Sequence, residues 1–344
     1  MKNPSVLHVC NNTTGGGETY FRNFLVLCDN YVLLELYNNN PNLISFKEKY
    51  ISLKPKFDIL TAIKSFFKFV SYVNSKKPEI INAEDYQSLI FTLIYSYIPF
   101  LYKPKKYYYT KHDPKLKSHL IFDVLQQIYF NKCKAVFCIS NSTKYSLENF
   151  HKGRFLTIYN GIFFPELKYR GQEDENTIFF FGRLVYKKGI DLLIDAFNSL
   201  DLKDYKLVIA GVASDKGILD IVKKNKNTVY AGVIGEEEKV KYLLRSKLVV
   251  IPSRVEGFGY TALESLYFRK KPETLIVSDI PPFKEILGDF PTYFESDNVE
   301  DLKLKLRHII DNIDKFKNRD VTNQIMKFSS KNMVESYYKV YNTD

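Results

Sequence analysis

The chain has 344 residues, about twice the length of one compact domain, so two domains are expected. With 45% hydrophobic and 26% charged residues but only 15 Gly and 13 Pro, the composition excludes a disordered or collagen-like protein. The four cysteines lie in apolar runs without metal-ligand spacing, which favours buried free thiols in a reducing compartment. The first apolar run is too short for a signal peptide, so a cytosolic protein is expected.

The formal net charge of +11 is distributed unevenly along the chain. Residues 1–165 hold 21 Lys and Arg against 11 Asp and Glu, whereas the remaining residues hold 29 against 28. This excess indicates an anionic partner for the first half, such as nucleic acid, a phospholipid surface or a phosphorylated acceptor. A lysine-rich composition without a function is the alternative. Nucleic acid is disfavoured because the basic half lacks a recognition motif.

Short apolar runs alternate with amphipathic stretches in the first half, which predicts parallel strands joined by helices. Strands are expected at 5–10, 31–36, 79–83, 106–110, 135–139 and 155–159. Residues 57–77 predict a helix with one apolar face, formed by Leu60, Ile63, Phe67, Val70 and Val73.

Residues 88–102 are the most hydrophobic stretch of the chain. They are too few to span a bilayer, and Pro99 interrupts them. Two interpretations remain: a buried crossover helix, or a helix with one face at the lipid interface. Lys103, Lys105 and Lys106 follow directly and are compatible with the second.

The second half repeats the alternation of strands and helices. Strands are expected at 177–181, 206–210, 228–231, 247–251 and 275–278, and helices begin near Gly189, Asp215, Glu236, Gly259 and Asn298. The polar, aperiodic segment 163–176 is predicted to be a linker. The sequence therefore predicts an α/β protein with two doubly wound domains, 1–165 and 166–321, and a last helix at 322–341.

Ligands of doubly wound sheets bind outside the carboxyl ends of the strands, so the loops there are candidate sites. The first loop contains Gly15, Gly16 and Gly17, which permit close approach to a phosphate or sugar, or form a turn without a ligand. His112 follows the strand at 106–110 and could bind a sugar hydroxyl or transfer a proton, although an isolated histidine is more often structural.

Two loops of the second half combine charge with glycine. One contains Gly182, Arg183 and Lys188 and opens a helix, and this cationic set suits a diphosphate. The other contains two carboxylates eight positions apart, Glu256 and Glu264, around a glycine-rich helix start. Backbone N–H groups there, near Gly257, Phe258 and Gly259, could bind phosphate.

Together these residues resemble the GT-B glycosyltransferases, specifically the retaining glycosyltransferase family 4, also called glycosyl transferases group 1. The resemblance covers most of the chain and rests on the order and spacing of seven short motifs. They are the glycine loop 15–17, Thr110-x-His112-Asp113, Ser140-Asn141-Ser142, Asn160-Gly161-Ile162, the segment 182–189, Glu256-x7-Glu264 and Ser278-Asp279. One departure follows Glu264, where Arg269 replaces an expected glycine and about three residues are added.

The resemblance implies two Rossmann-like domains that face a central cleft, with acceptor bound by the first and nucleotide sugar by the second. It implies that Arg183 and Lys188 bind the donor diphosphate, that Glu264 binds the ribose, and that Glu256 and His112 contact the transferred sugar. Gly16, Gly17, Gly182, Gly257, Phe258 and Gly259 complete the expected donor site. The helix at 322–341 is expected to return to the first domain.

The expected function is transfer of a sugar from a nucleotide-diphosphate donor to a hydroxyl acceptor, with retention of configuration. The acceptor is expected to be a lipid-linked or surface-polysaccharide glycan of the O-antigen, capsule or lipopolysaccharide type, at an anionic membrane surface. No Asp-x-Asp element occurs, so cationic residues are expected to replace a metal, and no cofactor is expected. The alternatives are a sugar epimerase, a soluble disaccharide synthase and a non-catalytic nucleotide-sugar-binding relative.

Overall fold

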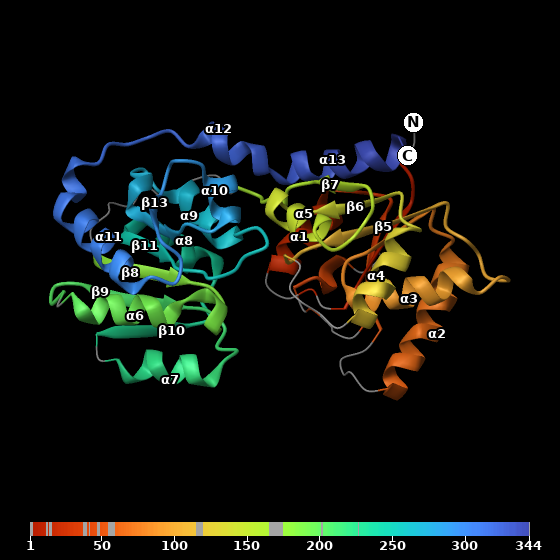
Figure 1. Cartoon of the computed structure of the whole chain (residues 1–344), viewed down its shortest axis with the longest axis horizontal. Coiled ribbons are helices and arrows are strands. Elements are labelled where there is room, and N and C mark those ends of the chain that lie inside the picture. Colours follow the sequence, from red (N-terminus) through yellow and green to blue (C-terminus); the bar gives the residue numbers. More distant parts are fainter. Residues whose placement is uncertain are drawn as a thin grey trace. The chain divides into compact units, whose positions relative to one another are not determined.

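The computed structural model describes residues 3–11, 13, 16–36, 40, 42–46, 49–53, 59–114, 120–164, 175–200, 202–225 and 227–343. The chain divides into two compact units (Figure 1). The first unit consists of Met1–Phe163 and Phe328–Asp344, and the second consists of Phe164–Lys327. Most of the predicted linker 163–176 lies outside the described residues. Each unit is built on one parallel sheet, which confirms the expected fold class.

The first unit contains a seven-stranded parallel sheet in the order β3-β2-β1-β4-β5-β6-β7. Its strands are β1 (Val6–Cys10), β2 (Tyr31–Glu35), β3 (Tyr50–Ser52), β4 (Ile80–Ala83), β5 (Lys106–Lys111), β6 (Ala135–Cys138) and β7 (Phe155–Thr157). The sequence predicts all of them except β3, whose three residues do not belong to a longer apolar run. The strand order reverses at β1, because the chain continues to β2 on one side and later to β4 on the other.

Helices pack on both faces of this sheet. Successive side chains of each strand point to opposite faces, so the apolar residues on both faces need to be covered. The bounds of the helices are α1 (Gly16–Leu27), α2 (Ile59–Lys76), α3 (Tyr86–Tyr97), α4 (Leu120–Phe130), α5 (Asn141–Glu148) and α13 (Ser330–Thr343). Val6 and Cys10 of β1 belong to a core with α1 and α13, whereas Leu7 and Val9 belong to a core with α2 and α3. Even-numbered residues of β1 therefore face α1 and α13.

The apolar face predicted for the helix at 57–77 is correct at Val70 and Val73 but wrong at Ile63 and Phe67, and the side chain of Leu60 lies outside the described part of the structure. In α2, Phe69 and Val73 are fully buried, but Ile63 is exposed and the side chain of Phe67 retains 65% of its accessible surface. This helix is apolar on several sides, so periodicity alone does not identify the side that meets the sheet. In the neighbouring α3, Leu89 is buried while Ile94 and Tyr97 are exposed, so the helix is not wholly buried, and the lipid-facing alternative stays a prediction.

The helix predicted at 322–341 is interrupted. Residues Thr322–Ile325 form a short helix, α12, in the second unit, and α13 begins only at Ser330 in the first. Between them, the N–H of Ile162 donates to the carbonyl of Phe328 (2.9 Å) and the N–H of Ser330 donates to the carbonyl of Ile162 (3.1 Å). The backbone there forms a bridge with residues 160–162 instead of continuing a helix.

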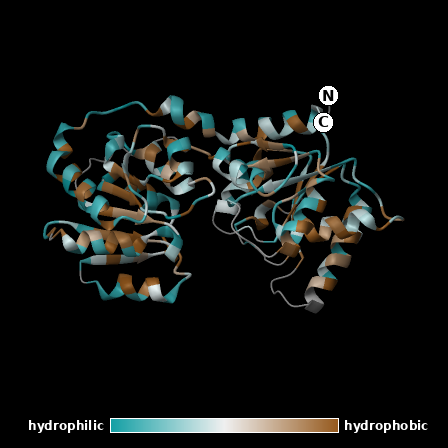
Figure 2. Ribbon diagram, viewed as in Figure 1, coloured by the Kyte–Doolittle hydropathy of each residue, from teal (hydrophilic) through white to brown (hydrophobic). Residues whose placement is uncertain are grey.

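The second unit contains a six-stranded parallel sheet in the order β10-β9-β8-β11-β12-β13. Its strands are β8 (Glu175–Phe181), β9 (Lys206–Ala210), β10 (Thr228–Gly232), β11 (Ser246–Ile251), β12 (Leu275–Ser278) and β13 (Thr292–Phe294), and Figure 2 shows hydrophobic residues along them. Its longer helices are α6 (Ile190–Ser199), α7 (Lys216–Lys224), α8 (Glu236–Arg245), α9 (Tyr260–Phe268), α10 (Pro281–Leu287) and α11 (Val299–Asn312). The sequence missed β13 and α10, which are both short.

The sequence departs from the expected family pattern after Glu264, and the contacts of Arg269 give a structural reason for this departure. The backbone φ of −94° at Arg269 does not require glycine, and its side chain is buried at the end of α9. The guanidinium donates to the carbonyls of Leu243 (3.0 Å), Ser246 (2.6 Å) and Lys247 (2.8 Å), which lie where α8 ends and β11 begins. A cation at the carboxyl end of a helix also interacts favourably with the helix dipole. Arg269 therefore holds α8, α9 and β11 together.

We expect Arg269→Ala to lower the free energy of unfolding by about 2 kcal/mol, because it leaves buried carbonyls without a charged donor. Chemical denaturation of the full chain measures this. Lys270→Ala is the matched control, because Lys270 is adjacent but exposed. An equal midpoint for both variants would contradict the role given to Arg269.

No helix within the described ranges is long and apolar enough to cross a membrane. The four cysteines are unpaired, and burial raises the pKa of the Cys28 thiol to about 11.

Candidate active site

The predicted donor residues lie at one edge of the second sheet. Arg183 and Lys188 follow β8, and Glu256 follows β11. These two strands are parallel neighbours, so their carboxyl ends lie side by side. The strand order reverses at β8, because the chain goes to β9 on one side and to β11 on the other. This is the position at which ligands of doubly wound sheets bind.

Lys188 and Glu256 form an ion pair that joins the two loops. Lys188 Nζ contacts Glu256 Oε1, and both side chains are almost completely buried. Ser253 Oγ donates to the same carboxylate oxygen (2.9 Å). A buried ion pair of this kind needs additional hydrogen bonds to offset desolvation, and Ser253 supplies one. The sequence predicts both charged residues here, but not their direct contact.

Close approach of the same two loops depends on Gly189, which has a φ of +66°. A Cβ atom at this position would lie 1.9 Å from the carbonyl oxygen of Pro252. Gly259, at the start of α9, likewise has a φ of +106°, and a Cβ there would lie 2.6 Å from the ring of Phe283. The glycines of both predicted loops therefore allow tight packing of the backbone.

Arg183 differs from Lys188 in being exposed. Its side chain forms no hydrogen bond or ion pair with any residue that the structure describes. It follows Gly182, whose N–H donates to the carbonyl of Ala210 in β9 (3.0 Å). An exposed guanidinium at the carboxyl edge of a sheet can bind an anion without first breaking an internal contact.

The other predicted donor residues surround the first turn of α9. Gly257 and Phe258 are buried directly before it, and Gly259 gives the helix no side-chain cap. Glu264 lies one turn further along and accepts a hydrogen bond from Lys239 Nζ of α8 (3.0 Å). Burial raises the pKa of the Glu264 carboxyl, and Lys239 opposes this rise.

Sequence reasoning missed Lys239 and also Arg254. Arg254 donates to both carboxylate oxygens of Asp191 (2.8 and 2.7 Å) and to Asp297 (2.6 Å). Its guanidinium also lies 3.9 Å from the centre of the Tyr186 ring. This bidentate pair links the loop after β11 to the first turn of α6. Only the tertiary contacts identify its partners, because these residues lie far apart in the sequence.

The glycine loop of the first unit leads into α1. Gly16 and Gly17 form the first turn of α1, while Gly15 lies outside the described residues. The preceding Thr13 donates through its backbone N–H (2.7 Å) and its hydroxyl (2.8 Å) to the buried carboxylate of Glu35. Glu35 ends β2 and anchors the start of this loop. The sequence could have identified Glu35 by its position at the carboxyl end of a predicted strand.

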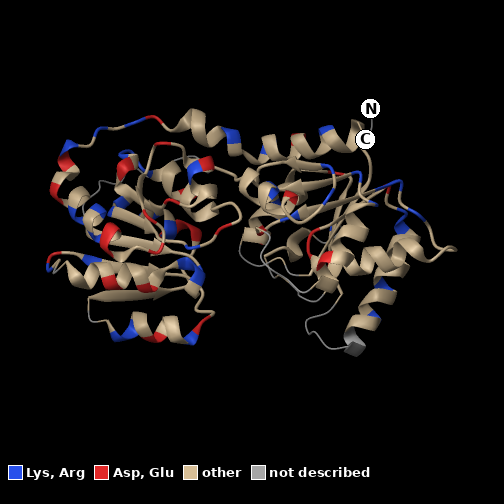
Figure 3. Ribbon diagram, viewed as in Figure 1, with Lys and Arg blue, Asp and Glu red and all other residues tan. Residues whose placement is uncertain are grey.

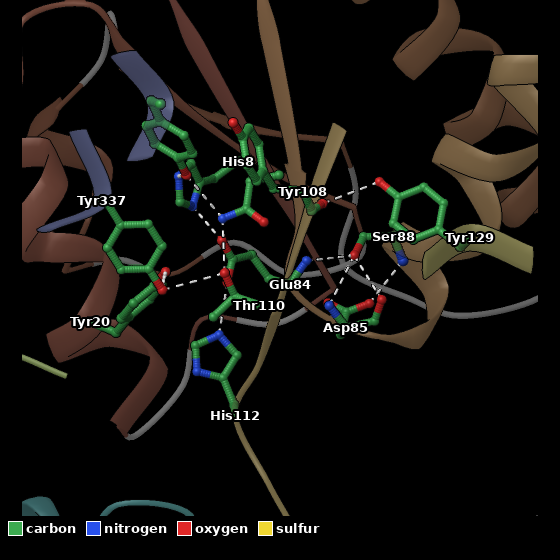
Figure 4. A network of polar contacts seen from close by, with 12 residues as sticks. His8, Tyr20, Glu84, Asp85, Ser88, Tyr108, Thr110, His112, Tyr129 and Tyr337 are labelled. Atoms are coloured by element: carbon green, nitrogen blue, oxygen red, sulfur yellow. Dashed lines mark hydrogen bonds and ion pairs between the residues drawn. The ribbon is translucent and has the colours of Figure 1, made fainter. Parts of the chain in front are cut away.

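His112 follows β5 and contacts a second carboxylate that sequence reasoning missed (Figure 4). Its Nε2 lies 2.8 Å from Oε2 of Glu84, which directly follows β4. The other oxygen of Glu84 contacts Nδ1 of His8, within β1. Figure 4 shows Glu84 between the two histidines.

The same network continues through hydroxyl and amide groups. Asn82 Nδ2 donates to the hydroxyls of Thr110 (2.8 Å) and Tyr341 (3.2 Å), and Tyr20 donates to Tyr337 (2.9 Å). Positions 8, 82, 84, 110 and 112 all have even numbers, and the strands β1, β4 and β5 are paired in register. Alternation therefore brings these polar residues to one face, although the sequence alone did not show their pairing.

Within the described ranges, no group of three or more His, Cys, Asp or Glu side chains has the arrangement of a metal site.

Several known proteins resemble this chain in sequence. An uncharacterized glycosyltransferase of Methanocaldococcus jannaschii is 32% identical over 182 residues, which are 52% of this chain and 50% of that protein. An uncharacterized 41.2 kDa protein from the cps region of Klebsiella pneumoniae is 24% identical over an alignment of 377 residues, covering 98% of this chain and 99% of that protein. The chain thus spans about half the length of the first relative and nearly all of the second.

A third relative has a defined activity. The Campylobacter jejuni enzyme GalNAc-α-(1→4)-GalNAc-α-(1→3)-diNAcBac-PP-undecaprenol α-1,4-N-acetyl-D-galactosaminyltransferase is 30% identical over 153 residues. The match covers 43% of this chain and 42% of that enzyme.

Solved structures share the fold of the whole chain at low sequence identity. Sucrose-phosphate synthase from Thermosynechococcus elongatus superposes with a TM-score of 0.80 over 98% of each chain at 16% identity. The Anabaena protein HepE in complex with UDP superposes with a TM-score of 0.79 over 99% of this chain and 100% of that chain at 14% identity.

The family model that matches this chain is described as glycosyl transferases group 1, and it matches residues 167–324. This range contains all of the predicted donor residues of the second unit. The second unit of the chain, over residues 167–324, therefore matches the glycosyl transferases group 1.

Proposed function

We propose that the protein transfers a sugar from a nucleotide-diphosphate donor to a hydroxyl acceptor, with retention of anomeric configuration. The observation that carries the proposal is the Lys188–Glu256 pair beside exposed Arg183, at the point where the strand order of the second sheet reverses. The match of residues 167–324 to the glycosyl transferases group 1 makes glycosyl transfer the appropriate reaction class. HepE, which shares the fold, was solved in complex with UDP, and this supports a nucleotide-containing donor.

In this proposal the second unit stabilises the departing diphosphate. Arg183 supplies a planar fork of donors and Lys188 a compact positive charge, and together they meet the charge that develops as the bond to the sugar breaks. Lys188 is already held by Glu256, so little reorganisation is required before the reaction. Glu264 accepts the ribose hydroxyls in a position that Lys239 fixes.

Front-face attack by the acceptor hydroxyl accounts for retention. Double displacement requires a carboxylate free to attack the sugar carbon, but Glu256 and Glu264 each bind a lysine. The departing diphosphate then accepts the proton of the attacking hydroxyl. Residues of this chain orient both substrates and stabilise charge without forming a covalent intermediate.

The proposal is tested by incubating the full chain with UDP, GDP and ADP sugars and a panel of lipid-diphosphate-linked glycans. We expect a product glycan with the anomeric configuration of the donor, determined by NMR. An inverted product would overturn retention. Nucleotide binding without transfer to any acceptor would instead support a non-catalytic sugar-binding protein.

The two glutamates are expected to have separable roles. Glu264→Ala should raise the Kd for free nucleotide about tenfold, because ribose hydroxyls lose a charged acceptor. Glu256→Ala should mainly lower kcat and leave nucleotide affinity within about twofold. Calorimetric titration with nucleotide and initial rates measure these effects. The control is Glu300→Ala, because Glu300 is an exposed glutamate of the same unit that pairs only with Lys303 in the described structure.

Equal nucleotide affinity and equal loss of activity in the Glu256 and Glu264 variants would show that the roles are assigned wrongly.

We further propose that the acceptor is lipid-linked and that the first unit binds an anionic membrane surface. The undecaprenol-linked substrate named for the Campylobacter relative and the cps region of the Klebsiella relative support this choice. Figure 3 shows basic residues along α2 and in the segment that follows α3. Each lysine of the predicted cluster has a partner within its own unit. Lys103 donates to the carbonyls of Tyr95 and Ile98, Lys105 pairs with Glu79, and Lys106 donates to the carbonyl of Tyr341. Lys115 and Lys117 lie outside the described residues.

The first unit also exposes apolar side chains on helices that pack together. On α4 the exposed residues recur at helical spacing, and on α3 and directly after it they lie near the carboxyl end. They are Leu120, Ile121, Val124 and Ile128 on α4, and Ile94, Tyr97 and Phe100 at α3. Lys132 Nζ lies 4.0 Å from the centre of the Tyr97 ring, which places a cation beside this surface. Apolar residues flanked by lysines suit the interface of an anionic bilayer.

The full chain should therefore sediment with anionic phosphatidylglycerol vesicles at low salt and be released at high salt, because screening weakens attraction between exposed charges. The double variant Leu120→Ser and Ile121→Ser should bind at least about tenfold more weakly, because these side chains no longer enter the lipid. Leu304→Ser is the matched control, since Leu304 is 67% exposed in the second unit, compared with 79% for Leu120 and 65% for Ile121.

Equal binding to neutral and anionic vesicles, or no binding to either, would favour a soluble acceptor.

A further inference from the structure

The backbone of Glu84 is fixed at the junction between β4 and α3. Its N–H donates to the carbonyl of Val9 in β1 and to Ser88 Oγ, each at 3.0 Å. Asp85 caps α3 by accepting from the N–H of Ser88 (2.8 Å), and the N–H of Asp85 donates back to Ser88 Oγ. This reciprocal capping box fixes the backbone position from which the Glu84 side chain extends.

The carboxylate of Glu84 lies between one buried and one accessible histidine. The side chain of Glu84 is 1% exposed, that of His8 is fully buried and that of His112 is 27% exposed. Burial raises the pKa of the Glu84 carboxyl, but His8 and His112 outweigh burial and leave this pKa below its usual value. An ionised carboxylate only accepts hydrogen bonds. Both histidines must therefore direct an N–H group toward Glu84.

This requirement assigns the proton of each imidazole. On His8 it lies on Nδ1, because Nδ1 faces Glu84. The other nitrogen of His8 lies 3.2 Å from the hydroxyl of Tyr341, which itself accepts from Asn82. The hydroxyl of Tyr341 therefore contacts both His8 and Asn82. On His112 the proton facing Glu84 lies on Nε2.

The His112 ring is also held from the side. The ring of Tyr20 meets it edge-on with centroids 4.7 Å apart, and the Tyr20 hydroxyl donates to Tyr337 of α13. In contrast, Nδ1 of His112 has no polar partner within the part of the chain that the structure describes. One nitrogen is therefore committed to Glu84, and the other remains available to a ligand.

We propose that Glu84 is a positioning residue for His112. It keeps a ring proton of His112 on Nε2 and leaves Nδ1 to accept from a hydroxyl of the transferred sugar. The step from His112 to the sugar rests on the proposed function. His8 contacts Glu84 directly, and Tyr341 and Asn82 hold His8 in place, so these three residues fix the orientation of Glu84. A ligand group that only accepts hydrogen bonds, such as a carbonyl, would not suit the same nitrogen.

A double-mutant cycle distinguishes positioning from a general contribution to folding. Glu84→Gln offers one acceptor oxygen to two N–H donors, and Glu84→Leu offers none. We expect kcat to fall about tenfold in the first variant and further in the second. In a His112→Ala background, the same two substitutions should change kcat less than about twofold. Equal losses in both backgrounds would overturn the proposal, because Glu84 would then not act through His112.

NMR of the full chain with ¹⁵N-labelled histidine tests the contact without an activity assay. We expect an Nε2–H signal that is absent in His112→Ala and lost in Glu84→Leu. The control is His8→Asn, which keeps an N–H donor near the position of Nδ1 and should retain the His112 signal. Persistence of the signal in Glu84→Leu would overturn the assignment, and if that variant does not fold, an unchanged His112 signal and unchanged kcat in Glu84→Gln would do so.

The two readouts separate failure of this inference from failure of the proposed function. If the wild-type chain transfers no sugar but the Nε2–H signal depends on Glu84, the proposed function fails and the positioning of His112 stands. If the chain is active and the cycle is additive, the function stands and Glu84 has another role.

Discussion

Truncation after Lys327 is expected to leave the first unit unfolded. The removed segment contains α13, whose side chains Met333, Val334, Tyr337, Tyr338 and Tyr341 are buried in the core that also contains α1 and β1. Burial of a large apolar side chain contributes roughly 1.5 to 3 kcal/mol. Five such losses are comparable with the roughly 5 to 15 kcal/mol that stabilise a whole domain. Circular dichroism and thermal denaturation should show loss of the unfolding transition of this unit.

Polar contacts make the effect of truncation larger. Without α13, Asn23 of α1 loses the hydrogen bond from Ser330 Oγ (2.8 Å) within a buried region, and Tyr20 loses its contact with Tyr337. The matched control is the variant Lys331→Ala and Glu335→Ala, because this pair lies on the exposed side of the same helix. A truncated chain that retains the melting temperature and activity of the full chain would show that α13 is dispensable.

Replacement of Lys188 or of Arg183 by alanine is expected to lower kcat by roughly 100-fold, or about 3 kcal/mol. Each substitution removes a cation that opposes the charge developing on the diphosphate. For Lys188 the effect has a second cause, since Glu256 would remain buried without its partner and repel the same phosphates. Initial rates at saturating donor measure the loss.

Lys187→Ala is the control for both cationic variants. Lys187 lies in the same loop and has the same charge, but it has no side-chain contact to a carboxylate in the described structure. Its replacement should change kcat by less than about threefold. If kcat falls less than threefold in the Arg183 and Lys188 variants as well, a metal ion or other residues must stabilise the diphosphate.

Strands were predictable from the sequence because each buried strand is a short apolar run between polar turns. Bounds at 206–210 and 275–278 agree with β9 and β12, and most others differ by one or two residues. β3 and β13 escaped prediction because their three residues do not belong to a longer apolar run, whereas the equally short β7 lies within the run 155–159. The face of α2 was predicted only in part, since Phe67 and Phe69 are equally apolar and only the sheet decides which one is buried.

For the candidate site, too, the sequence identified some features and only the tertiary structure identified others. Glycines beside Arg183, Lys188, Glu256 and Glu264 form short local patterns at strand ends, so the sequence by itself determined the fold class and the loops that carry the charged residues. The partners of these residues come from distant parts of the chain. Lys239 reaches Glu264 from another helix, and Arg269 replaces a glycine because three carbonyls from α8 and β11 surround it.

Glu84 is the clearest case of a residue that only the tertiary structure identifies. His8, Glu84 and His112 are separated by 76 and 28 positions, and of the three only His112 lies in one of the short motifs. Pairing of β1 with β4 and of β4 with β5 brings them to one face of the sheet. A local pattern determines which backbone conformation a segment adopts, whereas a contact between strand ends depends on register and burial, which exist only after the sheet has formed.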